Sequence, residues 1–530
     1  MPMDFFQEPL DFKKFDLFKT ESDEAFITYM GVTYSLKGSK FTKLLNQLHF
    51  ELTDFFPPKG DIKQIVDDLD IFTKIFCAIK PIFYRVARLG DTVYIDSGNE
   101  QFDVIEISGD SIKIVTNPPA KFIRSTIERK IGAPDLKAVA KDLNLLKKYV
   151  PFKSEQDFVL FVSWLLSCMN TNGGYPPLFL IGEQGSAKST TTAFIKDLLD
   201  NSAVPLRNLS KSMRDLMIAA SNDYILCYDN ISEITDKQSD SLCKLATGAG
   251  FTTRKLYTST EETQLTCKRP TVINTISFIP TRQDLLDRSV IVFVNHIKPE
   301  ERKTVKELWE SWHQDRPLIF GALCHAVSAA LRNYDKVNEE NLPRMADFAK
   351  WVTAAEEQLP WEKGLFLETL ENSRIMTVED TIEAEPVAMT ILNLMADKGK
   401  WIGNASELLD ALDNCIDQAR NRYPGWPKIP NQLTRKIGRV SAFLREKGIL
   451  IEKRHSGERF IEIVNLAHQA CRETIKMSKQ DGMELVQDTF SGSVKTPEYP
   501  VEIERDEIVK EAVADSETLL SGAAVTSTDF

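Results

Sequence analysis

The chain has 530 residues, of which 42% are hydrophobic and 27% charged, and its formal net charge is −12. This length exceeds what one hydrophobic core accommodates and predicts several domains. The acidic balance excludes a protein coated with basic surface, so any nucleic-acid contact must come from local patches. The 8 cysteines form no C-x-x-C pair, which excludes a zinc ribbon and favours reduced thiols.

The amino terminus lacks the basic and apolar segments of a signal peptide. The most apolar run, Phe158 to Met169, is 12 residues long, whereas a membrane-spanning helix needs about 20. We interpret this run as a buried helix and expect a cytoplasmic protein with no membrane role.

Residues 1–134 predict an N-terminal α+β domain that begins with a strand-like piece at Ala25–Tyr34 and a helix-like piece at Lys40–Phe56. Turn residues then separate four β-rich runs, which indicates a β-meander. The runs are Ile82–Arg88, Thr92–Asp96, Gln101–Ile107 and Ser111–Val115. No catalytic group of carboxylates stands out in this region, so we assign it to scaffolding or partner contacts.

Residues 135–300 alternate apolar strands with helices. A buried strand is predicted at Leu178–Ile181 and a helix at Lys188–Leu199. Further strands are expected at Tyr224–Tyr228, Pro270–Ile276 and Val290–Val294. This alternation predicts a mostly parallel sheet with helices on both faces.

The remaining residues fall into three segments. Helical patterns fill residues 301–400. Residues 401–466 have the order of a winged-helix module, with helices at Ser406–Asp413 and Gln432–Lys447 and a hairpin at Leu450–Val464. Periodicity then fades over residues 467–530. From residue 496 onward, nine acids and two bases give a net charge of −7, which predicts an acidic disordered tail.

A glycine-containing loop joins the first predicted core strand to its helix. Such a loop can turn its backbone amides toward phosphates, with a helix N-terminus and one cation beside them. We predict that Lys188 reaches the β- and γ-phosphates of ATP and that Ser189 ligates Mg²⁺. Ala187 replaces the last glycine of the usual pattern, and a plain Gly-Ser turn is the alternative. The predicted nucleotide-binding residues here are Gly182, Glu183, Gln184, Gly185, Ser186, Ala187, Lys188, Ser189 and Thr190.

Two later strand ends supply polar groups suited to the same site. Asp229 follows an apolar strand and is the expected second Mg²⁺ ligand. Asn230 stands where motor ATPases usually carry a glutamate base, a role that an amide cannot take, and Glu233 is the nearest substitute. Asn274 ends the next strand, where it would position the attacking water or simply terminate the strand.

Arg288 precedes the last predicted strand. An arginine there would neutralise the charge that develops on the γ-phosphate in a neighbouring subunit's site. A surface salt bridge with Asp284 or Asp287 is the alternative, and Arg282 competes for the same role.

The loop, Asp229, Asn274 and Arg288 follow one another in the order of AAA+ ATPases, which this chain resembles. More narrowly, it resembles helicase-type ATPases of phages and mobile elements near superfamily 3. The loop is also similar to that of minichromosome maintenance helicases. Tyr175–Val294 is similar to ATP-binding proteins of integrated elements, and the likeness covers most of residues 25–465.

The resemblance implies an α/β fold with a P-loop (AAA+) parallel-sheet core, an N-terminal α+β domain, a helical lid and a C-terminal winged-helix domain. It also implies a homo-oligomeric ring, usually a hexamer, in which Arg288 acts in trans and Arg344 senses the γ-phosphate. Replication partners would bind through the N-terminal domain.

Two regions are expected to contact DNA. The resemblance implies a pore hairpin, formed by Phe251–Tyr257 and Thr263–Cys267, with Arg254 and Lys255 as contacts; a solvated hairpin is the alternative. Residues 421–460 carry ten bases and three acids, a local reversal of charge that suits a DNA-binding winged helix. A protein-contacting module is the alternative. The predicted contacts there are Arg435, Lys436, Arg439, Lys453 and Arg454.

We therefore expect an ATP-driven DNA-translocating ring, a replicative helicase of a phage, plasmid or integrated element. Because Asn230 replaces the usual base, a nucleotide-gated DNA-binding switch or loader with little hydrolysis stays open. A regulatory or defence ATPase of such an element is a third possibility.

Overall fold

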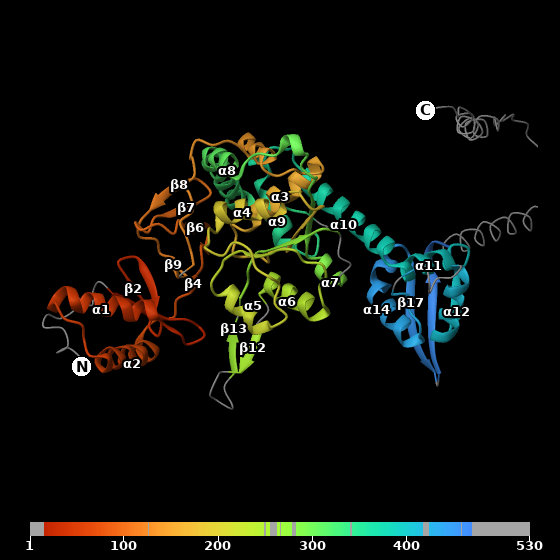
Figure 1. The fold of residues 1–530 in the computed structure, drawn as a ribbon, viewed down its shortest axis with the longest axis horizontal. Helices are drawn as coiled ribbons and strands as arrows, with labels where there is room; N and C mark the ends of the chain where they lie inside the picture. Colours follow the sequence, from red (N-terminus) through yellow and green to blue (C-terminus); the bar gives the residue numbers. More distant parts are fainter. Residues whose placement is uncertain are drawn as a thin grey trace, which may run out of the picture. The chain divides into compact units, whose positions relative to one another are not determined.

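The computed structural model describes residues 15–125, 127–248, 251–254, 262–265, 267–277, 282–339, 342–416, 423, 425–456 and 458–468. The chain forms one unit at Met1–Asn465 and a second at Leu466–Phe530. All elements named below belong to the first unit (Figure 1). The predicted acidic tail lies outside the described residues.

A small sheet and two helices begin the described chain. The strands follow one another in antiparallel order, and the helices cover the sheet around a separate apolar cluster that includes Ile27, Phe41 and Ile65. The elements are β1 (Phe15–Lys19), β2 (Ala25–Tyr29), β3 (Val32–Ser35), α1 (Ser39–Thr53) and α2 (Lys59–Phe76).

The predicted β-meander is confirmed as a four-stranded antiparallel sheet in sequential order. Its first predicted run, Ile82–Arg88, was wrong as a single strand. Arg85 adopts a left-handed φ of 57°, which breaks the extended chain, so β4 (Ile82–Phe83) pairs instead with β9 (Lys121–Phe122). The meander consists of β5 (Val86–Leu89), β6 (Thr92–Asp96), β7 (Val104–Ile107) and β8 (Ile112–Val115).

A four-stranded parallel sheet forms the centre of the unit, as the alternation of strands and helices predicted. Its order is β11-β14-β10-β15, so β14 lies between the first two core strands of the chain. The strands are β10 (Leu178–Ile181), β11 (Leu226–Tyr228), β14 (Thr271–Thr275) and β15 (Val290–Phe293).

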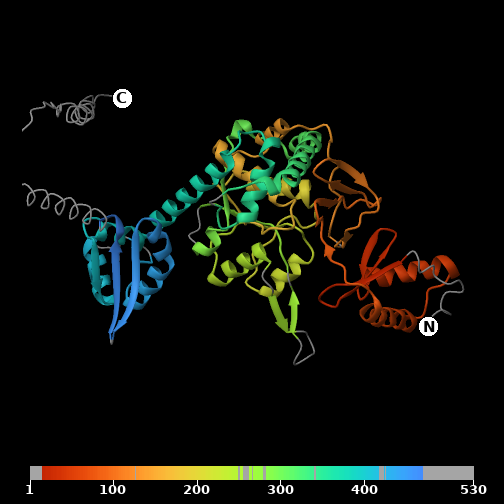
Figure 2. The ribbon, with the colours of Figure 1, turned by 180° about the vertical axis from the view of Figure 1, so that it is seen from behind.

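Helices cover both faces of this sheet (Figure 1), and the view from behind shows the same two layers (Figure 2). Leu178 and Leu180 of β10 pack into one apolar cluster, while Phe179 and Ile181 pack into another, because successive strand residues point to opposite faces. The first cluster holds residues of α3 (Glu155–Ser167), α4 (Lys188–Leu199), α8 (Val305–Asn333) and α9 (Ala346–Ala355), and the second those of α5 (Met213–Ala220), α6 (Asp236–Thr247) and α7 (Gln283–Leu286).

The C-terminal part of the unit contains the two helices and the hairpin that were predicted within residues 401–466. The order of its antiparallel sheet is β16-β18-β17, and α11 packs against α12 and α14 in the same apolar cluster. The elements are α10 (Leu365–Ala384), α11 (Pro386–Met395), β16 (Lys400–Gly403), α12 (Ala405–Cys415), α14 (Pro430–Glu446), β17 (Ile449–Ser456) and β18 (Glu458–Asn465).

The remaining elements are a hairpin and short turns of 3₁₀-helix. The hairpin lies on the side of the core that carries α5 and α6 (Figures 1 and 2). These elements are β12 (Phe251–Arg254), β13 (Glu262–Leu265), η2 (Ala140–Lys148), η3 (Pro299–Glu301), η4 (Tyr334–Lys336) and η5 (Glu356–Gln358). Within the described part of the chain, no helix has both the length and the apolar character needed to cross a membrane.

A buried ion cluster lies at the end of α4. The Lys196 ammonium, 2% exposed, is 2.7 Å from Asp200 Oδ2 and 3.0 Å from Asp223 Oδ1, and it also donates to the Ile225 carbonyl. Burial acts to lower the pKa of Lys196, but the charges of the two aspartates outweigh it and raise the pKa. Arg207 binds the other oxygen of Asp223 at 2.9 Å.

The β-meander joins this cluster through Arg85, which is 2% exposed. Its Nε lies 3.5 Å from Asp200 Oδ1, and its Nη2 lies 3.1 Å from Glu128 Oε1. Its Nη1 donates to the Asp96 carbonyl at 2.9 Å. Burial raises the pKa of Glu128, against the charge of Arg85. The left-handed turn at Arg85 thus carries a guanidinium from the meander to the parallel-sheet core.

We predict that Lys196→Met destabilises the chain by about 3 kcal/mol, because it leaves two buried carboxylates without their shared cation. The midpoint of thermal unfolding should fall by roughly 3 °C. Lys147→Met is the matched control, since Lys147 pairs with Glu155 at the surface and exposed pairs contribute less than about 1 kcal/mol. Equal midpoints for the two variants would contradict the assigned role of the cluster.

Candidate phosphate-binding site

The predicted phosphate loop connects the end of β10 to the start of α4. Gly185 and Ala187 both have left-handed φ angles, 85° and 56°, so Ala187 adopts the conformation that the usual glycine of the pattern would favour. Gly182 is confined for another reason. A Cβ there would lie 2.6 Å from the Val294 carbonyl oxygen and 2.7 Å from Ser186 Oγ. The backbone of the loop therefore depends on the absence of side chains at its two glycines.

Lys188 is the first residue of α4, and its side chain folds back over the loop. Its ammonium donates to the carbonyls of Gly182 (2.6 Å) and Glu183 (2.9 Å) and to Ser186 Oγ (3.2 Å). Burial lowers the pKa of Lys188, while the charge of Asp229 acts to raise it. The Lys188 ammonium thus lies against the loop, and the loop leads directly into the N-terminus of α4.

Three polar side chains from separate elements meet beside this loop. Ser189 Oγ donates to Asp229 Oδ2 at 2.9 Å, and Asn274 Nδ2 donates to Asp229 Oδ1 at 2.8 Å. Thr192, one turn further along α4, donates to Asn274 Oδ1 at 3.1 Å. The structure therefore brings together the predicted residues Ser189, Asp229 and Asn274. Thr192 was not predicted, because a threonine inside a helix carries no distinguishing pattern.

The sheet order explains this meeting. All four strands are parallel, so the carboxyl ends of β10, β11 and β14, with Asn274 near the end of β14, lie at the same edge of the sheet. Because β14 lies between the other two strands, Asn274 is interposed between the loop and Asp229. Asn230 comes next with a left-handed φ of 55°, and Ile231 N donates to the Asn274 carbonyl at 3.0 Å, which turns the chain away from the edge.

The donor set fits Mg²⁺ in kind. A hydroxyl and a carboxylate oxygen 2.9 Å apart are hard oxygen ligands, and Mg²⁺ bound with a nucleotide uses few protein ligands because phosphates and water supply the others. Among the described residues, no group of three or more His, Cys, Asp and Glu side chains could hold a metal ion by itself.

Arg288 and Arg344 lie at the other edge of the sheet. Arg288 precedes β15, whereas the loop follows β10. Four parallel strand residues at about 3.3 Å each separate the two edges by about 13 Å. Arg288 Nη1 contacts Asp284 Oδ1 at 2.5 Å, and Arg344 Nη2 contacts the same oxygen at 2.5 Å. The structure therefore does not bring Arg344 to the loop of its own chain.

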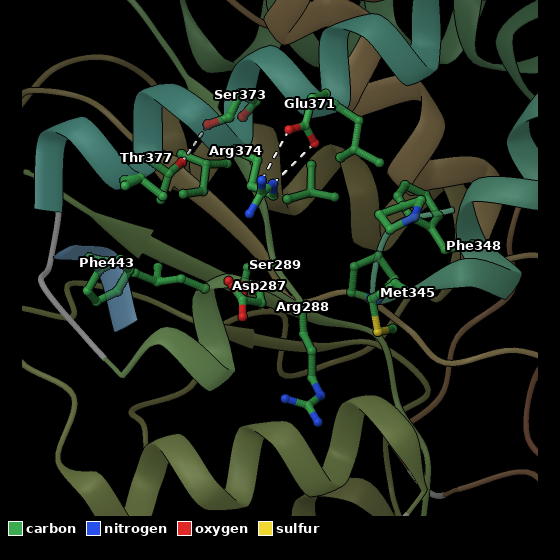
Figure 3. A pocket seen from close by; sticks show the side chains of 17 residues that line it. Asp287, Arg288, Ser289, Met345, Phe348, Glu371, Ser373, Arg374, Thr377 and Phe443 are labelled. Carbon is green, nitrogen blue, oxygen red and sulfur yellow. Dashed lines mark hydrogen bonds and ion pairs between the residues drawn. The ribbon is translucent and has the colours of Figure 1, made fainter. Parts of the chain in front are cut away.

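Asp284 holds both arginines. Burial acts to raise its pKa, but its hydrogen bonds and the charges of Arg288 and Arg344 keep the pKa below its usual value. Arg288 lines a pocket together with Glu371 and Arg374, and Figure 3 shows its side chain extending away from Arg374, which Glu371 binds. The salt bridge to Asp284 that was the alternative for Arg288 is present in the single chain.

Glu233 and Arg282 do not join the Ser189–Asp229–Asn274 group. Arg282 pairs with Asp240 at 2.6 Å. Glu233 lines an open cleft of about 300 Å³ together with Arg282 and with Arg439 of α14. The cleft therefore lies between the chain that follows Asp229 and the C-terminal helix.

The predicted DNA-contacting residues differ in whether an acidic side chain of the same chain pairs with them. On α14, Lys436 pairs with Glu385 at 2.6 Å and Arg439 with Asp236 at 3.4 Å. Arg435 is exposed, and no carboxylate of the described residues lies within 4 Å of it. On β17, Lys453 is exposed and Arg454 pairs with Glu462 at 2.6 Å. Arg254 ends β12, and Lys255 lies outside the described residues.

Two segments of the chain are similar to replication proteins of mobile genetic elements. Residues 143–365, which include the whole parallel sheet, match the family model described as actinomycete integrative conjugative element replication protein. Residues 387–479 match the model described as AICE RepA C-terminal domain. These matches support a role in the replication of a mobile element.

Solved structures that match this chain include two apo structures of the NrS-1 C-terminal region. Their TM-scores are 0.41 and 0.40 at 11% and 13% sequence identity, and each comparison covers 88% of this chain and 99% of the other. A JCV helicase structure has a TM-score of 0.21 at 13% identity, covering 42% of this chain and 65% of the other. No curated protein matches the sequence.

Proposed function

We propose that this chain is a P-loop ATPase that forms a ring and moves DNA during replication of a mobile element. The observation that carries the proposal is the hydrogen-bonded group Ser189–Asp229–Asn274 beside a glycine loop, at the carboxyl edge of a parallel sheet. Ligands of α/β proteins bind at that edge, and the family models independently point to replication.

Each side chain has a distinct role in the proposed site. When the nucleotide binds, the Lys188 ammonium would leave the loop carbonyls and donate to phosphate oxygens, which accept stronger, charge-assisted hydrogen bonds. Ser189 and Asp229 hold Mg²⁺, which would neutralise charge on the phosphates. Asn274 orients Asp229 through one side of its amide and is itself fixed by Thr192 through the other. The Asn274 amide is therefore already held in its orientation by two hydrogen bonds before any ligand binds.

A nucleotide-gated switch is the second candidate function, and the identity of Asn230 favours it. An amide cannot accept a proton from water. The left-handed backbone at Asn230 also turns the chain sharply at the position where a base would follow Asp229. In this case ATP would assemble a ring on DNA with little turnover.

Steady-state ATP hydrolysis with and without single- and double-stranded DNA distinguishes the two functions. A motor should hydrolyse ATP faster in the presence of DNA and unwind a forked duplex, whereas Lys188→Ala should lose at least about 100-fold of the rate because it removes the phosphate-binding cation. Wild-type protein that binds ATP but shows no turnover with any DNA would exclude the motor and leave the switch.

A ring with shared sites makes a further prediction. Because Arg288 lies at the edge opposite the loop, we propose that it completes the site of the adjoining subunit, after release from Asp284. Arg288→Ala and Lys188→Ala subunits should each be inactive alone. Mixed together, they should recover part of the ATPase rate, since some sites then pair an intact loop with an intact Arg288.

The matched control is a mixture of Lys188→Ala and Asp229→Asn subunits. Both substitutions damage the loop side of a site, so no subunit in this mixture supplies an intact one and no activity should return. Recovery in the control mixture, or none in the Arg288 mixture, would contradict a site shared between subunits.

We also propose that the C-terminal module binds DNA as a winged helix. Of the three predicted contacts on α14, Arg435 is best suited to a phosphate, because Lys436 and Arg439 each have an acidic partner within the chain. Arg435→Glu should weaken DNA binding by at least about 10-fold and reduce the slope of log Kd against log salt by about 1. Lys63→Glu makes an equal charge change at an exposed position of α2 and should leave binding unchanged. Equal effects of the two reversals would argue against this interface.

A further inference from the structure

The segment that follows β15 crosses the phosphate loop. Asn295 N donates to the Pro151 carbonyl at 2.7 Å, and Ile297 N donates to the Gly185 carbonyl at 3.3 Å. Asn295 Nδ2 also donates to the Phe152 carbonyl at 3.1 Å. Three hydrogen bonds thus fix the path of this segment, and one of them ends on the loop itself.

His296 contacts both the loop and an arginine. Its Nδ1 lies 2.9 Å from the Gln184 carbonyl oxygen. A carbonyl only accepts, so Nδ1 carries the hydrogen. Its Nε2 lies 3.4 Å from Arg302 Nη2. A guanidinium only donates, so Nε2 accepts. These two contacts require the neutral ring with the hydrogen on Nδ1.

Arg302 is therefore held near the loop by a neutral group. A Cβ placed on Gly185 would lie 2.8 Å from the His296 ring and 3.9 Å from Arg302 Nη2, so ring and guanidinium both flank Gly185. Within the part of the chain that the structure describes, no carboxylate lies within 4 Å of the Arg302 guanidinium. Arg288 and Arg344 differ, because both are neutralised by Asp284.

We infer that Arg302 is an additional phosphate-binding residue of the nucleotide site, supplied by the same chain as the loop, and that His296 is its positioning residue. The inference rests on the proposed nucleotide site. A histidine acceptor orients the guanidinium without cancelling its charge, which leaves that charge for an anion. A guanidinium also offers two parallel donors to a phosphate group, which complements the single ammonium of Lys188.

The first test measures Kd for ATP and ADP in wild type and in Arg302→Ala, Arg302→Lys and Lys303→Ala. We expect Kd to rise at least 10-fold in Arg302→Ala. In Arg302→Lys, which retains the charge, Kd should stay within 3-fold of wild type. Lys303→Ala removes an equal charge from the next residue and should bind as wild type does. A Lys303→Ala loss equal to that of Arg302→Ala would overturn a specific contact.

Wild type that binds no nucleotide would refute the proposed function. Wild type that binds, together with an unchanged Arg302→Ala, would refute this inference alone. The midpoint of thermal unfolding without nucleotide should stay the same in Arg302→Ala. If that variant unfolds early, Arg302→Gln provides the measurement, since glutamine keeps most of the side-chain volume.

The second test addresses His296. Asparagine can donate to the Gln184 carbonyl and accept from Arg302, as the neutral imidazole does, whereas alanine can do neither. His296→Ala should raise Kd for ATP at least 5-fold, and His296→Asn should recover most of that loss. In a background that already carries Arg302→Ala, His296→Ala should add no further loss. A full second loss there would show that His296 does not act through Arg302.

Discussion

The main-chain hydrogen bonds that hold β14 between β10 and β11 decide which side chains meet at the carboxyl edge of the sheet. Without that insertion, Asp229 would follow the strand next to the loop, and Asn274 would lie on its far side. With it, one amide spans the distance from Thr192 on α4 to Asp229 beyond β11. Burial of apolar residues on both faces of the sheet stabilises this order, so the position of polar atoms at the edge depends on the two cores.

The charged groups of the core divide between the two edges of the sheet. At the carboxyl edge, Lys188 and Arg302 hydrogen-bond to carbonyl and imidazole partners, and Asp229 is the nearby acid whose charge acts on Lys188. At the opposite edge, Asp284 compensates both Arg288 and Arg344. A single chain therefore has cations bound to neutral partners at one edge of the sheet and arginines paired with an aspartate at the other. Such a division would suit the proposed ring, in which Arg288 would leave Asp284 for a phosphate bound in the adjoining subunit.

The elements of the sheet were predictable because each is a short apolar run bounded by polar residues, and the loop was predictable because its glycines lie between such a run and a helix. The partners of Arg344 were not, since Asp284 is 60 residues away and no local pattern records the contact. The turn at Arg85 was missed because β-rich residues flank it on both sides, and its acidic partner Asp200 lies far along the chain. His296 and Arg302 carry no motif at all, and only the path of the segment after β15, which crosses the loop, brings them to Gly185.

Arg85 and its partners also constrain the order in which the chain can become compact during synthesis. Arg85 leaves the ribosome more than one hundred residues before Asp200 does. A buried guanidinium with only part of its acidic environment is costly, so Arg85 stays hydrated until α4 has been made. Domains generally fold as units as they emerge, but here the meander acquires its last counterion, Asp200, from the parallel-sheet core that follows it.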